Sequence, residues 1–155
     1  MEMHAVNVAD ALRGVARLFL DTAPVVYHIE RHPNYTVVVD EIFDRIDAGT
    51  MAGVTSPITL SECLVVPIRL GQVNLQQDFA DLIVSGQGIT FVPLDDAIAR
   101  RAAELRARYN LALTDALQIA TALAAGCDAF LTNDLALQRV QEVPILVIDQ
   151  LQVSP

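Results

Sequence analysis

The sequence predicts an α/β protein, a three-layer α/β/α sandwich in which helices cover both faces of a five-stranded parallel sheet. Two observations indicate this class. Short runs of apolar residues alternate along the chain with longer segments whose apolar residues recur at helical spacing. Within the short runs the apolar character is nearly continuous, which is typical of parallel strands buried on both faces.

Five of these runs are the expected strands. The first ends in an acid, Asp21, and the third is stopped by Pro93, which has no backbone N–H to donate to a sheet. In chain order the runs span residues 16–21, 52–56, 88–92, 129–132 and 145–148.

The segments between the runs have recognisable helix ends. Pro24 opens the first helix, since proline is favoured in a first turn, and Pro33 closes it. Gly49 ends the next one. The segment 114–126 is apolar around most of its circumference, so we expect this helix to be buried. The expected helices span 24–32, 35–48, 58–70, 75–85, 95–109, 114–126 and 135–140.

The length of 155 residues, without repeats or Gly/Ser-rich linkers, predicts one domain. All expected strands lie within residues 16–155, and residues 1–15 are expected to form an N-terminal extension, helical or loose. No run approaches the roughly 20 apolar residues that cross a bilayer, and the start lacks the pattern of a signal peptide. We therefore expect a cytoplasmic protein that does not contact membranes.

The charge balance limits the function. Nineteen acids stand against ten bases, all of them arginine, and the net charge is −9. An acidic protein is poorly suited to non-specific binding of a polyphosphate, so an RNA substrate would require divalent metal and a few well-placed arginines. The absence of lysine argues against phosphatase and phosphoacceptor sites, and no glycine-rich loop with lysine is present for nucleotide hydrolysis.

Four acids fall where parallel sheets bind ligands, beyond the carboxyl ends of the strands. Asp21 ends the first strand, and Asp134 follows the fourth. Asp115 lies in the first turn of the apolar helix, and Glu62 lies one turn into the helix after the second strand. Taken singly, each acid also has a structural explanation as a helix cap, a partner of a helix dipole, a turn residue or a solvated charge.

Taken together, the four acids indicate a metal site. Carboxylates crowded at one edge raise each other's pKa unless a cation lies between them. Oxygen ligands are those that Mg²⁺ and Mn²⁺ prefer. Such a site can activate a water and stabilise the charge of a phosphodiester displacement.

Four segments resemble, in order, the four motifs of PIN domains. The similarity runs from about Arg17 to Ile148 and covers nearly the whole domain. The segments are 20–27 (LDTAPVVY), 55–62 (TSPITLSE), 113–122 (LTDALQIATA) and 130–134 (FLTND).

This resemblance implies a sheet ordered 3-2-1-4-5 and cleavage of RNA that depends on Mg²⁺ or Mn²⁺. It implies that Asp21, Glu62, Asp115 and Asp134 bind the metal and form the catalytic site. It also implies the toxin half of a VapBC-type toxin–antitoxin pair, which forms a homodimer and receives the antitoxin's tail in its acidic groove.

Two positions depart from the family pattern. Ala23 stands where many members have asparagine, and Gln118 stands where many have histidine. Neither is one of the four carboxylates, so we expect these departures to affect substrate preference more than metal binding.

Candidate substrate contacts surround the acids and include two arginines of the helix over 95–109. Glu104 offers i,i+4 pairing to Arg100 and Arg108, so this helix carries either a solvated, ion-paired face or a contact to the RNA backbone. The candidate contacts are Thr22, Ser61, Thr132, Asn133, Arg100 and Arg108.

The alternative function is a non-catalytic PIN-like module for protein interaction or assembly. The intact carboxylates argue against it, and the acidic composition mildly favours it.

Overall fold

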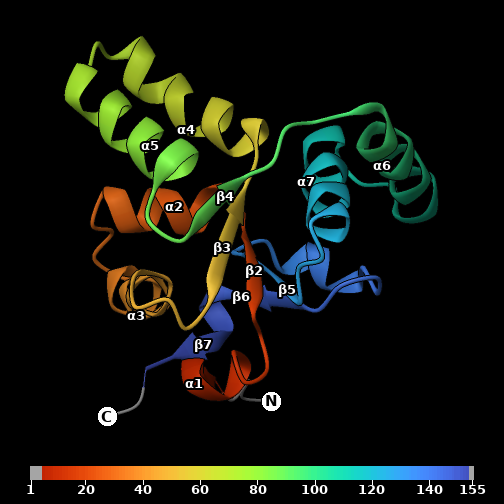
Figure 1. Cartoon of the computed structure of the whole chain (residues 1–155), viewed down its shortest axis with the longest axis horizontal. Coiled ribbons are helices and arrows are strands. Elements are labelled where there is room, and N and C mark those ends of the chain that lie inside the picture. The colour runs from red at the N-terminus through yellow and green to blue at the C-terminus, as the bar shows by residue number, and fades with distance from the viewer. Residues whose placement is uncertain (1–4, 154–155) are drawn as a thin grey trace.

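The computed structural model describes residues 5–153 and has a five-stranded parallel sheet at its centre (Figure 1). The strands lie in the order β4-β3-β2-β5-β6. Counted along the chain within this sheet, that is 3-2-1-4-5, so the predicted order is confirmed. The strands are β2 (Arg17–Leu20), β3 (Ala52–Thr55), β4 (Ile89–Phe91), β5 (Ala129–Thr132) and β6 (Ile145–Val147).

Helices cover both faces of this sheet, which confirms the three layers. Figure 1 shows α2, α3 and α5 on one side of the strands and α6 and α7 on the other. The bounds are α2 (Thr22–Ile29), α3 (Thr36–Asp47), α4 (Pro57–Arg69), α5 (Val73–Ser85), α6 (Asp96–Tyr109) and α7 (Leu113–Ala124), with 3₁₀ helices η1 (Leu135–Arg139) and η2 (Ile148–Gln150).

Side chains of the central strand alternate between two hydrophobic cores. Leu18 and Leu20 belong to the core beneath α2, α3 and α5, whereas Phe19 belongs to the core beneath α6 and α7. The Phe19 ring stacks on Phe130 of β5, with centroids 5.1 Å apart. Because successive strand residues point to opposite faces, a continuous apolar run is what a doubly covered strand requires.

The first helix begins two residues earlier than the proline pattern predicts. It starts at Thr22, with Asp21 at the N-cap position, so Pro24 is the third helical residue. Proline is tolerated there because the first N–H groups of a helix have no partner within the helix. The early start matters because it joins Asp21 to the end of β2 and the beginning of α2 at once.

The stretch before β2 contacts the domain from Val6 on, and residues 1–4 of the expected extension lie outside the described residues. Short strands β1 (Val6–Asn7) and β7 (Leu151–Gln152) pair in parallel, and α1 (Val8–Ala11) follows β1. Val8 is fully buried in the first core. The domain boundary at residue 16 remains a prediction. Among residues 5–153, no helix has both the length and the apolar character needed to span a bilayer.

Candidate active site

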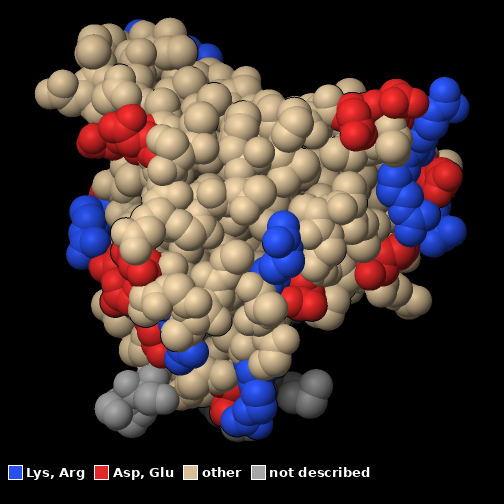
Figure 2. Space-filling model, viewed as in Figure 1, with Lys and Arg blue, Asp and Glu red and all other residues tan. Residues whose placement is uncertain are grey.

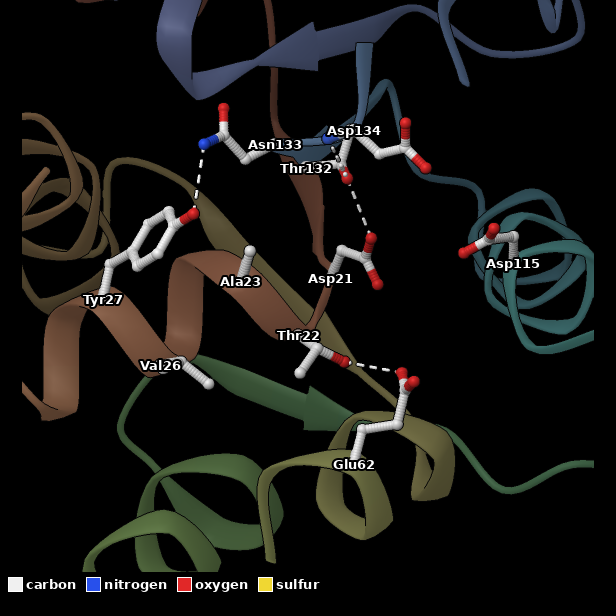
Figure 3. A pocket seen from close by; sticks show the side chains of 10 residues that line it. All are labelled: Asp21, Thr22, Ala23, Val26, Tyr27, Glu62, Asp115, Thr132, Asn133 and Asp134. Carbon is white, nitrogen blue, oxygen red and sulfur yellow. Dashed lines mark hydrogen bonds between the residues drawn. The ribbon is translucent and has the colours of Figure 1, made fainter. Parts of the chain in front are cut away.

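A pocket of about 410 Å³ opens at the carboxyl ends of β2 and β5 and contains all four predicted acids (Figure 3). The acids come from four different elements of the fold, as expected for elements that leave the same edge of a parallel sheet. The pocket is lined by Asp21, Thr22, Ala23, Val26, Tyr27, Glu62, Asp115, Thr132, Asn133 and Asp134.

Asp21 is held in place by strand β5. Its backbone N–H donates to the Leu131 carbonyl at 3.0 Å, and its carboxylate Oδ2 accepts from the Thr132 hydroxyl at 2.9 Å. Burial raises the pKa of Asp21 above its ordinary value, although hydrogen bonds from the Thr22 backbone and the Thr132 side chain act against this shift. Asp21 is therefore an oriented carboxylate in surroundings that disfavour its charge.

A buried polar network lies behind Asp21. The Gln118 amide donates to Thr59 Oγ1 at 2.8 Å and, at 3.5 Å, to Asp21 Oδ1, and its oxygen accepts from the Ser56 hydroxyl. Thr59 in turn donates to the Leu20 carbonyl at 3.4 Å. These three polar side chains are at most 1% exposed, so a network shielded from water supports the Asp21 carboxylate from behind, while Asp21 itself lines the pocket.

Glu62 and Asp134 stand at the rim of the pocket. Glu62 is exposed and accepts a hydrogen bond from the Thr22 hydroxyl at 2.7 Å. Asp134 is also exposed, and its Oδ1 caps η1 by accepting from the Ala136 N–H at 3.0 Å. The capping explanation for Asp134 is therefore correct, and Asp134 also lines the pocket (Figure 3).

Asp115 shows the electrostatic character of the pocket most clearly. Its pKa is raised to about 6, first by partial burial and then by the negative charges of Asp21, Asp134 and Glu62, whereas Arg139 acts in the opposite sense. Asp115 therefore faces the negative charges of three neighbouring carboxylates across one cavity.

The donor set fits a hard divalent cation that retains part of its water shell. Within residues 5–153, no three acidic, histidine or cysteine side chains are close enough to form a closed cage. The carboxylates are instead spread around an open pocket, and all available donors are oxygens. Magnesium ions are typically bound in this way, by a few carboxylates with waters completing the shell.

The predicted substrate contacts divide into two groups. Thr22, Thr132 and Asn133 line the pocket, whereas Ser61, Arg100 and Arg108 do not. Figure 2 shows blue and red side chains interleaved along α6, at the right of the view. The prediction that Glu104 pairs with Arg100 or Arg108 is wrong, because Glu104 bonds Arg101 three residues away. The ion pairs are Arg100–Asp96 (3.4 Å), Arg101–Glu104 (2.8 Å) and Arg108–Glu142 (2.7 Å).

Sequence reasoning did not assign four residues to the site. Ala23, Val26 and Tyr27 line the pocket from α2, and Arg139 lies near Asp115. The spacing of Ala23, Val26 and Tyr27, three and four residues apart, places them on one helix face and is the signal that could have identified them. Arg139 gave no such signal, because its position depends on how η1 folds back.

Comparison with known proteins identifies the family. The family model described as PIN domain matches residues 18–143, most of the chain. The chain belongs to the PIN domain family. No curated protein matches this PIN domain at a significant level.

Several solved structures share the fold of this PIN domain. The VapBC complex of Rickettsia felis bound to a DNA fragment from its promoter has a TM-score of 0.66 and 19% identity, covering 84% of this chain and 98% of that one. A VapC toxin of Mycobacterium tuberculosis that cleaves the sarcin–ricin loop has a TM-score of 0.64 and 16% identity, with coverages of 82% and 98%. DNA-bound VapBC of Salmonella typhimurium has a TM-score of 0.62 and 19% identity, with coverages of 85% and 98%.

Replacing Gln118 with methionine tests the buried network. Gln118→Met keeps the side-chain length but removes the hydrogen bonds that Gln118 makes with the buried Ser56 and Thr59 hydroxyls, so we expect the free energy of unfolding to fall by about 1–3 kcal/mol. Urea denaturation measures it. Gln77→Met is the matched control, because Gln77 is exposed on α5 and bonds the exposed Asp81, and its effect should stay within about 0.5 kcal/mol. Equal effects of the two variants would contradict the role of the network.

The raised pKa of Asp115 predicts how stability depends on pH in the metal-free protein. Between the ordinary value of 3.8 and the folded value of about 6, the folded state binds the proton more tightly than the unfolded state. The contribution of Asp115 to stability therefore falls as pH rises through this window. At pH 7 in EDTA, Asp115→Asn should be more stable than wild type by about 1 kcal/mol, allowing for solvent screening.

Thermal unfolding measured from pH 4 to pH 7 checks this expectation, and the difference between variant and wild type should shrink toward pH 4. Asp44→Asn, an exposed acid on α3, should show no such trend. The electrostatic account of the pocket fails if Asp115→Asn is less stable than wild type at pH 7.

Proposed function

We propose that this PIN domain is an endoribonuclease of the cytoplasm that depends on Mg²⁺ or Mn²⁺, and that it is the toxin of a toxin–antitoxin pair. The observation that carries the proposal is the convergence of four carboxylates from four elements on one pocket, where the pKa of Asp115 is raised to about 6. A cation between the carboxylates would relieve this repulsion and stabilise their charged forms. Divalent cations held by carboxylates can promote phosphodiester hydrolysis.

The four acids have distinct surroundings, which suggests distinct roles. Asp21, Asp115, Asp134 and Glu62 would hold the ion, which supplies Lewis-acid stabilisation of the phosphodiester when bound. Thr132 and Gln118 orient the buried Asp21 carboxylate. Glu62 is exposed and oriented by Thr22, so it is placed to accept a proton from an attacking water.

Charge compensation explains how an acidic chain would hold RNA. Arg100 and Arg108 remain candidate contacts to the RNA backbone, but both are engaged in ion pairs, Arg100 with Asp96 and Arg108 with Glu142. Arg139 lies nearer the acids, although its guanidinium donates to the Tyr109 and Ala136 carbonyls. We therefore propose that the metal supplies most of the attraction for the scissile phosphate.

Cleavage of a panel of structured RNAs tests the nuclease. We expect wild type to cut at least one RNA in Mg²⁺ or Mn²⁺ and to be inert in EDTA. Asp21→Asn and Asp115→Asn should each lower the rate by more than about a hundredfold, since changing even an outer partner of a metal site can cost that much. Asp44 is exposed and does not line the pocket, so Asp44→Asn should cut like wild type.

Two results would contradict the nuclease. Cleavage that survives EDTA or both pocket substitutions would point to a contaminating enzyme. Equal inertness of wild type and variants across the panel would instead favour the non-catalytic assembly module.

Partner proteins follow from the same proposal. Similar chains occur in solved toxin–antitoxin complexes, and the acidic pocket is complementary to a basic peptide tail. A homodimer is supported by exposed apolar side chains on the α4–α5 hairpin, whose tip is largely uncharged in Figure 2. These side chains are Val65, Val66, Ile68, Leu70, Val73 and Val84.

Light scattering tests the assembly, with an expected mass of twice the 16.8 kDa of one chain. Ile68→Asp should give monomers, whereas Val37→Asp on α3 should not, although the two side chains are equally exposed at 59% and 60%. The protein encoded beside this chain should co-purify with it and block cleavage. A wild type that is monomeric and binds no such neighbour would contradict the assembly.

A further inference from the structure

The pocket has two chemically different ends (Figure 3). The carboxylates of Asp115, Asp134 and Glu62 gather toward one side. The other side is formed by Ala23, Val26 and Tyr27 from a single face of α2. The acids account for binding of metal and phosphate, but an apolar surface continuous with them has no part in that chemistry.

Tyr27 at the apolar end is fixed by its neighbours. Its hydroxyl accepts a hydrogen bond from the Asn133 amide at 3.1 Å, and Asn133 is itself anchored by the Asp149 N–H at 2.9 Å. The Tyr35 ring stacks on Tyr27 with centroids 4.3 Å apart, and His32 meets Tyr27 edge-on at 5.0 Å. The aromatic wall is therefore ordered before any ligand arrives, which lowers the entropic cost of binding.

Ala23 keeps the space in front of this wall open. It lies one helical turn before Tyr27, and its methyl group points into the pocket (Figure 3). Any longer side chain at this position would occupy the cavity between the acids and the ring. The cavity of about 410 Å³ is near the lower end of the range of roughly 300–1,000 Å³ for small-molecule sites, so its size suits one nucleotide rather than several.

We propose that the apolar end formed by Ala23, Val26 and Tyr27 is a nucleobase subsite, which holds the base adjacent to the phosphodiester bound at the acidic end. This inference rests on the proposed nuclease. A nucleotide joins a metal-binding phosphate to a flat apolar ring within one short unit, and this one pocket offers both kinds of surface. The Tyr27 hydroxyl, which accepts from Asn133, retains its own proton to donate to an acceptor on the base.

Methyl NMR of the full chain in Mg²⁺ tests the subsite directly. The probes are adenosine and uridine 5′- and 3′-monophosphates, and ribose 5-phosphate serves as the matched ligand without a base. The nucleotides should move the Ala23 and Val26 methyl signals upfield through the ring current of the base. They should also bind about tenfold more tightly than ribose 5-phosphate, within the range found for stacking of one base on an aromatic ring.

Variants test separately the aromatic ring of Tyr27 and the open cavity next to Ala23. Tyr27→Phe keeps the ring and should retain most of the base-dependent affinity, whereas Tyr27→Leu should reduce the nucleotide advantage to less than about twofold. Ala23→Asn should have the same effect by filling the cavity, with Ala103→Asn on an exposed face of α6 as its control. Melting curves establish that each variant is folded, and the Ala23 variant keeps the test decisive if Tyr27→Leu fails to fold.

The outcomes distinguish the subsite from the nuclease. Cleavage of RNA by wild type with equal affinities for nucleotides and ribose 5-phosphate overturns the subsite and leaves the nuclease standing. Base-dependent binding without cleavage of any RNA supports the subsite and overturns the nuclease. If an arginine-rich peptide shifts the Ala23 methyl signal and nucleotides do not, the apolar end receives a protein segment and the subsite is wrong.

Discussion

Asp21 and Thr132 meet because β2 and β5 pair in parallel with Leu20 opposite Leu131. A slip of one residue would turn the side chains of β2 to the opposite faces of the sheet and would remove Asp21 from Thr132. The stacked Phe19 and Phe130 rings resist such a slip from within one core. The packing of hydrophobic side chains thus fixes where the most buried carboxylate of the pocket lies.

The charge distribution of this domain is consistent with that placement. Ten arginines cannot neutralise nineteen acids, and three of the four arginines of α6 are already paired with acids on or near that helix. Little positive charge therefore reaches the pocket, where Arg139 opposes the rise in the pKa of Asp115. The negative charge of the carboxylates must therefore be neutralised by a bound cation. The same cation would also reduce the repulsion between the pocket and a phosphate of the substrate.

Continuous apolar runs predicted all five strands of the main sheet. Apolar residues at helical spacing between these runs predicted the helices, and the alternation of the two predicted the three layers. The ends of the predicted strands were sufficient to place Asp21 and Asp134 at the site. Asp115 and Glu62 could equally be a helix-dipole partner and a solvated charge, and only the family resemblance assigned them to the site. Pairing on α6 was mispredicted because i,i+4 spacing leaves open which acid an arginine reaches, and Asp96 and Glu142 were closer partners. The β1–β7 pair joins residues far apart in the chain, and two-residue strands leave no periodic pattern to detect.

The β1–β7 pair has a topological consequence. It brings the first and last described strands side by side, and Figure 1 shows β7 next to α1 at the bottom of the view. The backbone from β1 to β7 is thereby almost a closed ring. Neither β1 nor β7 contributes a residue to the lining of the pocket. The position of the chain ends can therefore be changed without removing a residue of the pocket. A permuted chain, with its ends moved to the α4–α5 turn at Gly71, would preserve every hydrogen bond around Asp21.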